Sequence, residues 1–447
     1  LHRHAALEAI YDSAESFPQP RCHPETRINL LNDLRHQLDD PGVRVLWLHG
    51  PAGAGKSAIM QTLCRQLHDS GKLGGSYFFK RDHGIRGNAR GLFATLAYQL
   101  AIFDPTLKPG ISKMVEKNPA LVSTSIPSQL QQLIVEPCRL VPDRVGRILL
   151  IDELDECDGI AVQQEILRSI HSIFCAHTLP LKLVIASRPE PDIRELFKSL
   201  QTGPRVYGLH MTNIQQSFRD VHIYLRREFA RIHSSHHATM SKILTPWPSE
   251  DILSMLVEKS SGYFVYAATV IKFVDDKQFR ATEQLDIILR LDPTCDGSDS
   301  PYDSLDRLYI HILRQVPIRF RPRLLAILSL IGAGWWFRPA HIDLLFGFEH
   351  GDAQLTLRRL HSILSIDDGG LARIQPRHAS FVDFLLSERR SCEFHITQQH
   401  RLHLARCALK IMSWTQLPET THWAWCVTSS IRSHSNLLTL ASMQAGG

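Results

Sequence analysis

The residues with the clearest chemistry in this chain form a short glycine-rich run near its N-terminal end. They fit the pattern G-x-x-x-x-G-K-[ST] at every fixed position: Gly50, Pro51, Ala52, Gly53, Ala54, Gly55, Lys56 and Ser57. Glycines in this pattern let successive backbone N–H groups turn toward phosphate oxygens, and a following helix adds the positive end of its dipole. We expect Lys56 to reach the β- and γ-phosphates of a nucleotide and the Ser57 hydroxyl to ligate Mg²⁺.

The sequence on either side of this run supplies the secondary structure that such a loop requires. An apolar stretch at residues 43–48 predicts a strand before it, and residues 58–63 follow a helical pattern after it. A strand, a glycine-rich loop and a helix in this order distinguish a phosphate site from a turn that carries Gly-Lys-Ser by chance. The segment therefore predicts nucleotide binding.

A second segment offers the carboxylates that a nucleotide-bound metal needs. Apolar residues 148–151 predict a buried strand, and the acidic residues Asp152, Glu153, Asp155 and Glu156 follow it. We expect Asp152 to hold Mg²⁺ directly or through water. Glu156 or Glu153 is then expected to position or deprotonate the attacking water. Without the phosphate loop, the segment is equally consistent with a strand that runs into an acidic turn.

A third apolar strand, at residues 183–186, ends in Ser187-Arg188-Pro189. An arginine at the end of such a strand is suited to face a γ-phosphate and to sense whether it is present. The alternative is an arginine that only caps the strand end. We assign Arg188 to the site as a prediction.

Several segments resemble the NACHT family of signal-transducing NTPases. The acidic segment 152–156, followed by Ser187-Arg188-Pro189, is similar to the family pattern. Three further stretches resemble its fungal members: residues 22–27, residues 78–81 with 93–101, and residues 378–385, which are similar to the histidine motif of the family's winged-helix domain. The resemblance covers most of residues 9–410. The chain is thus identified as similar to a fungal NACHT-domain protein of the STAND class, related to NOD-like receptors.

The resemblance implies a signalling switch in fungal innate immunity or incompatibility. ADP holds a closed monomer, in which His378 contacts the β-phosphate, and exchange for ATP, or for GTP in some members, opens the chain and permits self-oligomerisation. Hydrolysis is slow, and effector and sensor domains or proteins complete the system. The alternative for His378 is a histidine that is satisfied locally beside a helix.

The chain departs from the family pattern in two places. Glu153 stands where family members usually carry a small residue, and an acid at this position resembles AAA-type ATPases instead. The identity of the catalytic acid therefore stays open among Glu153, Asp155 and Glu156. Related plant-type switches place a Gly-x-Pro against the adenine. The corresponding residues 262–264 are Gly-Tyr-Phe, which leaves the base contact unassigned.

The elements that must position these residues alternate between apolar strands and helical patterns. This alternation predicts an α/β P-loop NTPase domain, a parallel sheet with helices on both faces. Further strands are expected at residues 76–79 and 206–207, and a helix at 92–102. Helices followed by a hairpin at residues 365–374 indicate a winged helix. The predicted divisions are a lead-in (1–25), the nucleotide-binding domain (26–210), a helical domain (211–292), a winged-helix domain (300–390) and the start of a further helical region (391–447).

Composition limits the classes of function. The 447 residues are 44% hydrophobic and 21% charged, as in globular domains, and a net charge of +5 from 50 basic and 45 acidic residues does not by itself imply a polyanionic partner. Nine cysteines without a C-x-x-C pair favour a reducing, cytoplasmic location. The longest apolar stretch, at residues 324–337, is too short to span a membrane.

Two other functions compete with the switch. One is a P-loop ATPase that acts on nucleic acid through its winged helix. The expected recognition helix at residues 352–364 exposes few basic side chains, so nucleic acid is not an expected partner. The cluster Arg319, Arg321 and Arg323 is interpreted as a solvated helix end. The other is a scaffold with an inactive site, which the retained loop and Asp152 disfavour.

Overall fold

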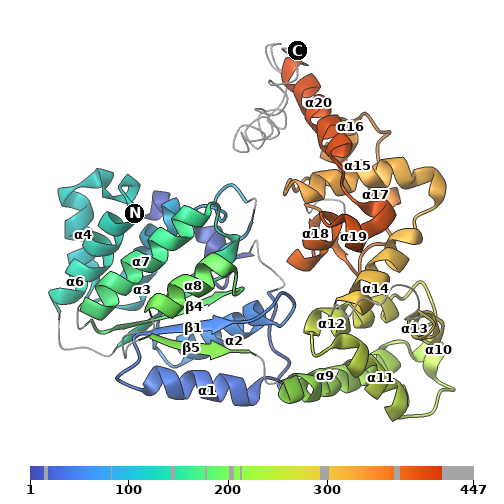
Figure 1. Cartoon of the computed structure of the whole chain (residues 1–447), viewed down its shortest axis with the longest axis horizontal. Helices are drawn as coiled ribbons and strands as arrows, with labels where there is room; N and C mark the ends of the chain where they lie inside the picture. The colour runs from blue at the N-terminus through green and yellow to red at the C-terminus, as the bar shows by residue number, and fades with distance from the viewer. Residues whose placement is uncertain are drawn as a thin grey trace. The chain divides into compact units, whose positions relative to one another are not determined.

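The chain divides into two compact units, Leu1–Ser217 and Phe218–Gly447 (Figure 1). The computed structural model describes residues 1–14, 19–81, 83–141, 146–176, 179–200, 206–211, 214–291, 302–366 and 373–414.

The first unit is built on a parallel five-stranded sheet with the order β2-β3-β4-β1-β5. Its strands are β1 (Val45–His49), β2 (Leu73–Phe78), β3 (Arg147–Asp152), β4 (Leu181–Ser187) and β5 (Val206–His210). The carboxyl ends of parallel strands meet at one edge, and there His49 lies opposite Ser187. This edge therefore gathers the loop after β1, the acidic turn after β3 and the segment after β4.

The alternation of side chains along the strands divides the apolar core between the two faces of the sheet. On one face, Leu46, Leu150 and Val184 pack with buried residues of α1 (Ile28–Asp39) and α2 (Lys56–Asp69). On the other, Trp47 and Ile185 belong to a cluster with α3 (Leu92–Phe103), α7 (Ile160–Ala176) and α8 (Pro191–Leu200). The predicted sheet with helices on both faces is confirmed.

Strand β2 begins at Leu73, three residues before the predicted start at 76. The prediction missed the first half of the strand because two glycines there were interpreted as a break. A Cβ on Gly74 would lie 2.9 Å from the Arg147 Cβ, and one on Gly75 would lie 3.2 Å from the Gln99 Cβ. Glycine here permits close packing instead of ending the strand.

Shorter elements complete the described part of the first unit. They are α4 (Lys108–Lys117), α5 (Ile126–Gln129), a π-helical turn (Leu130–Val135), α6 (Glu136–Arg139) and 3-10 helices at His2–His4, Leu7–Ala9, Ala89–Gly91, Pro119–Ser123 and Leu154–Glu156.

The second unit is helical. Helix α9 (Ile214–Ser235) begins before the boundary between the units and continues past it. It is followed by α10 (His237–Met240), α11 (Glu250–Ser260), α12 (Phe264–Val274), α13 (Ala281–Leu289), α14 (Asp303–Arg314), a 3-10 turn (Ile318–Phe320), α15 (Arg321–Gly332), α16 (Pro339–Phe346), α17 (Asp352–Leu357), α18 (Ala379–Leu385), α19 (Glu388–Ser391), a 3-10 turn (Cys392–Phe394) and α20 (Gln398–Trp414).

Helices α15 to α17 are followed by an antiparallel pair of short strands, β6 (Leu364–Ser365) and β7 (Gln375–Pro376), as in a winged helix. The expected recognition helix was wrong in length: α17 ends at Leu357, because Leu364 pairs with Pro376 in extended conformation. The predicted hairpin turn at 367–370, the linker at 292–301 and residues 415–447 of the further helical region lie outside the described residues.

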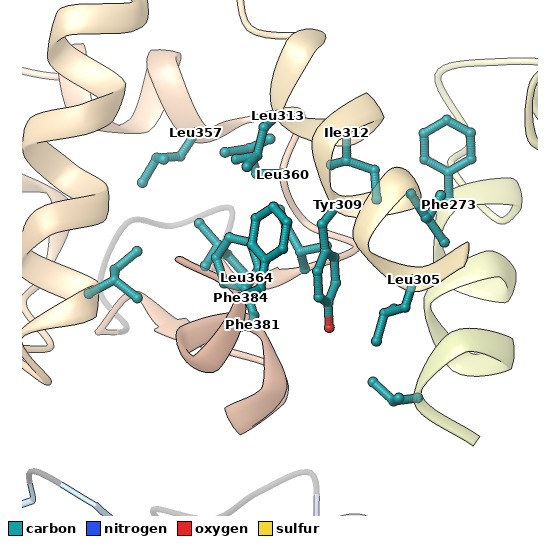
Figure 2. Packing of buried hydrophobic residues seen from close by; sticks show 14 of the residues in the cluster. Phe273, Leu305, Tyr309, Ile312, Leu313, Leu357, Leu360, Leu364, Phe381 and Phe384 are labelled. Carbon is teal, nitrogen blue, oxygen red and sulfur yellow. The ribbon is translucent and has the colours of Figure 1, made fainter. Parts of the chain in front are cut away.

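The described residues on both sides of the predicted boundary at 292–300 share one apolar core. Figure 2 shows Tyr309 and neighbouring residues of α14 between Phe273 on α12 and the two phenylalanines of α18. The Tyr309 ring packs edge-on against Phe381 and Phe384, with centroid distances of 5.1 and 5.2 Å.

Candidate functional site

The phosphate loop connects β1 to α2 and has the backbone that its glycines allow. Gly53 and Gly55 have φ angles of 77° and 93°, in the left-handed region that favours glycine. A Cβ on Gly55 would meet no atom within 4 Å, so the backbone conformation, and not crowding, requires glycine there. The loop leads directly into the N-terminus of α2 at Lys56. Such a turn against a helix N-terminus is an anion-binding arrangement.

The Lys56 side chain lies over its own loop. Its Nζ donates to the carbonyl oxygens of Gly50 and Pro51, at 2.9 and 3.0 Å. Burial lowers the pKa of this ammonium, and the neighbouring carboxylates Asp155 and Asp152 act in the opposite direction. An ammonium has three donor protons, so these two carbonyls leave one for a phosphate oxygen.

Asp152 ends β3 and is fully buried. Among the described residues, neither of its carboxylate oxygens has a hydrogen-bond partner. Burial raises its pKa to about 7, against the nearby Ser57 hydroxyl and Lys56 ammonium, which both lower it. Unpartnered buried oxygens are costly, and carboxylate and hydroxyl oxygens are ligands that Mg²⁺ accepts. Asp152 and Ser57 therefore fit the predicted metal site.

Glu153 is bound to the other predicted metal ligand. The Ser57 hydroxyl donates to the Glu153 Oε1 at 2.8 Å. The backbone of Glu153 has a φ of 56°, a left-handed conformation that costs a residue other than glycine about 1 kcal/mol. This conformation favours glycine over any residue that carries a Cβ. Burial, and then the charge of Asp152, raise the pKa of Glu153 to about 7.

Asp155 and Arg188 form a hydrogen bond and an ion pair with each other. The Asp155 Oδ1 accepts the backbone N–H of Arg188 at 2.8 Å, and its Oδ2 lies 3.2 Å from the Arg188 Nε. Both side chains are largely buried. The contact joins the acidic turn after β3 to the segment after β4, and it suits Asp155 to position the predicted sensor arginine.

Glu156 has a different environment. Its Oε2 accepts the backbone N–H of Arg81 at 3.2 Å, and the side chain is buried. Burial, followed by the charges of Glu153 and Asp155, raises its pKa to about 8. A carboxyl group that titrates near physiological pH has the basicity expected of a general base.

His378 belongs to the second unit, where it is the N-cap of α18. Its Nδ1 accepts the backbone N–H of Ser380 at 3.1 Å and lies 2.7 Å from the Ser380 hydroxyl. A neutral ring that accepts at Nδ1 carries its proton on Nε2, which is then a donor. The structure thus brings together the loop, Asp152, the other three acids and Arg188 in the first unit, and gives His378 a capping role in the second.

Sequence reasoning missed Arg27 as part of the site. Its Nη2 donates to the Ala54 carbonyl oxygen at 2.9 Å, and its Nη1 donates to the Ser217 hydroxyl at 3.1 Å. Arg27 lies in residues 22–27, one of the stretches that resemble fungal NACHT members, but no spacing linked it to the phosphate loop.

Comparison with known proteins gives one family model that includes the phosphate loop, and it assigns no function. The family model "Nephrocystin 3, N-terminal" matches residues 29–188, which include the phosphate loop, Asp152 and Arg188. No curated protein matches the chain. The loop, the acidic turn and the sheet that holds them are those of a P-loop NTPase domain.

Solved structures with similar architecture have low identity. A Drosophila ORC structure bound to DNA has 15% identity over 84% of this chain and 97% of its own, with a TM-score of 0.34. Aeropyrum pernix ORC1 in complex with DNA has 16% identity, coverages of 82% and 94%, and a TM-score of 0.34. A mutant of Thermotoga maritima RuvB has 14% identity, coverages of 80% and 94%, and a TM-score of 0.32. Values of this size assign no function to the chain.

None of the described helices is both long enough and apolar enough to cross a membrane.

Proposed function

We propose that the chain is a nucleotide-dependent signalling switch of the NACHT type. It binds ATP or ADP, or the guanine equivalents, with Mg²⁺, hydrolyses the triphosphate slowly and couples exchange to self-oligomerisation. One observation carries the proposal: a glycine loop in left-handed conformation lies beside Asp152, whose buried oxygens are unpartnered among the described residues.

Each residue of the site has a role in this proposal. The N–H groups of the loop and the Lys56 ammonium bind phosphate oxygens, and Ser57 and Asp152 hold the metal. Bound Mg²⁺ supplies positive charge that neutralises the phosphates. Glu156 orients a water molecule and accepts its proton, while Asp155 keeps Arg188 at the end of β4.

The environment of Glu156 is consistent with slow turnover. The raised pKa keeps this carboxyl group largely protonated near neutral pH in the free protein. A base that is mostly protonated contributes little, so hydrolysis is limited until bound ligand changes the surrounding charge. A regulatory NTPase uses such a delay because the triphosphate state must persist.

The nucleic-acid alternative has weaker support in the second unit. Arg323 lies 2.7 Å from Asp352, and Arg321 lies 3.5 Å from Glu393. These two members of the basic cluster are already paired with acids, which reduces the charge available for DNA phosphates.

Light scattering during size exclusion tests the proposal. We expect a monomer with Mg-ADP and a larger assembly with Mg²⁺ and a non-hydrolysable ATP analogue. Equal masses in the two states would contradict the switch. Titration of labelled duplex DNA at 50 and 200 mM salt checks the alternative, which requires tight binding that falls steeply with salt.

A further inference from the structure

Arg27 occupies an unusual place at the start of α1. It is the N-cap of that helix, has a φ of 60° and is only 5% exposed. The turn before it is closed by Thr26, whose backbone N–H and hydroxyl both donate to the His23 carbonyl oxygen at 2.9 Å. A buried arginine in a left-handed conformation is costly unless its contacts compensate. The contacts of its guanidinium must therefore offset this cost.

The guanidinium joins the phosphate loop to the first turn of α9. One nitrogen donates to the carbonyl oxygen of Ala54, between the two left-handed glycines, and another donates to Ser217. A trans peptide is planar, so its C=O and its N–H point in opposite directions. Fixing the Ala54 oxygen toward Arg27 therefore turns the Gly55 N–H away from Arg27. In a loop of this kind, such N–H groups are the phosphate donors.

We propose that Arg27 is a positioning residue that sets the Ala54–Gly55 peptide for phosphate binding and couples it to α9 through Ser217. This inference rests on the proposed nucleotide function. Helix α9 extends from Ile214 to Ser235, and its residues Val221, Leu225 and Phe229 are buried in the core of the second unit.

Coupling of this kind works in both directions. If bound nucleotide stabilises the loop conformation that Arg27 holds, it also stabilises the contact with Ser217 and the first turn of α9. By linkage, the factor by which bound nucleotide stabilises this turn is also the factor by which nucleotide affinity falls when the turn is displaced. The planar guanidinium suits the task because its donors are fixed relative to one another, whereas a lysine would offer a single point charge.

Three variants of the full chain separate the two parts of the proposal. Arg27→Gln removes both contacts, and Ser217→Ala removes only the link to α9. Asn29→Ala is the matched control, because Asn29 makes a neighbouring but exposed contact from α1 to Gln216 on α9, at 3.3 Å. Affinity for Mg-ADP is measured by calorimetry, and hydrogen exchange across α9 is measured with and without Mg-ADP.

We expect Arg27→Gln to weaken Mg-ADP binding by about tenfold or more, which is the loss typical of a charged hydrogen bond, and to abolish nucleotide-dependent protection at the start of α9. Ser217→Ala should keep its affinity within about threefold of the parent and lose only the protection. Asn29→Ala should keep both.

Four outcomes would overturn a claim. No binding by the parent would refute the proposed function itself. Parental affinity in a folded Arg27→Gln protein would refute the positioning role. Protection that persists in Ser217→Ala would refute the coupling, and this variant decides the coupling even where Arg27→Gln does not fold. Loss of the protection in Asn29→Ala would assign the coupling to general α1–α9 packing and overturn the specific role of Arg27.

Discussion

Replacing Glu156 with glutamine should stabilise the nucleotide-free protein at alkaline pH. It should also slow hydrolysis of bound ATP. The carboxyl group is buried, and its pKa is raised from 4.5 to about 8. Because the folded state binds this proton more tightly, the stabilisation is complete below the unfolded pKa and is lost as the pH rises through 8. A pKa raised this far means that the parent loses about 5 kcal/mol of its free energy of unfolding by pH 9, at 1.36 kcal/mol per pH unit.

Glutamine has nearly the same shape and keeps an oxygen to accept the Arg81 N–H. Burying its amide costs about 1–3 kcal/mol, so we expect a net gain of about 2–4 kcal/mol at pH 9 and no gain near pH 5. For a unit of this size, the gain at pH 9 corresponds to a rise in melting temperature of about 5–15 °C. The assay is a thermal melt in EDTA at both pH values, without nucleotide.

The same variant should lose catalysis. A positioned general base contributes about 10²–10⁴-fold, so single-turnover hydrolysis of saturating Mg-ATP should fall by that factor while binding survives. Glu153→Gln is the matched control and should slow hydrolysis less. A stability difference between variant and parent that is the same at pH 5 and pH 9 would refute the burial argument. A larger loss of hydrolysis in Glu153→Gln would assign the base to Glu153 instead.

Substitutions at three further positions test other parts of the account. Asp155→Asn should destabilise the protein by about 3 kcal/mol in urea unfolding, because it removes the carboxylate that pairs with the largely buried Arg188; an unchanged midpoint would contradict this. At Glu153, glycine should be more stable than alanine by about 1 kcal/mol, since only glycine relieves the left-handed backbone; the usual preference for alanine would count against it. His378→Ala should speed ADP release and increase, without completing, oligomer formation with ATP, because one contact supplies about 1.5–3 of the ~5.5 kcal/mol that full switching requires. Unaltered release from a folded variant would remove His378 from the switch.

Local patterns predicted much of the first unit. Apolar runs located each of the five strands. The glycine loop was predicted from its residue pattern and its flanking strand and helix, and Asp152 from its place at the end of an apolar strand. These features are legible because each depends on residues that are close in sequence. The start of β2 was missed, since Gly74 and Gly75 are read as a break unless their packing partners are known.

The contacts that join distant segments were not predictable from one sequence. Nothing near Arg27 indicates that it reaches Ala54 and Ser217, which are brought to it by the fold. The roles of the three acids were also left open, because they depend on which neighbour each one contacts. Asp155 binds Arg188, Glu153 binds Ser57 and Glu156 accepts the Arg81 N–H. A spacing of one to three residues cannot separate these environments.

The central claim is that the phosphate loop binds a nucleotide, and calorimetric titration of the parent and Lys56→Ala with Mg-ADP tests it most directly. The Lys56 ammonium lies over the carbonyl oxygens of its own loop, so its removal should abolish binding and leave the fold intact. Ligand at ~1,000 times its dissociation constant stabilises a native state by about 4 kcal/mol. The parent should therefore bind and gain a higher melting temperature, and the variant should do neither. Equal binding and equal shifts in melting temperature in both proteins would contradict the account.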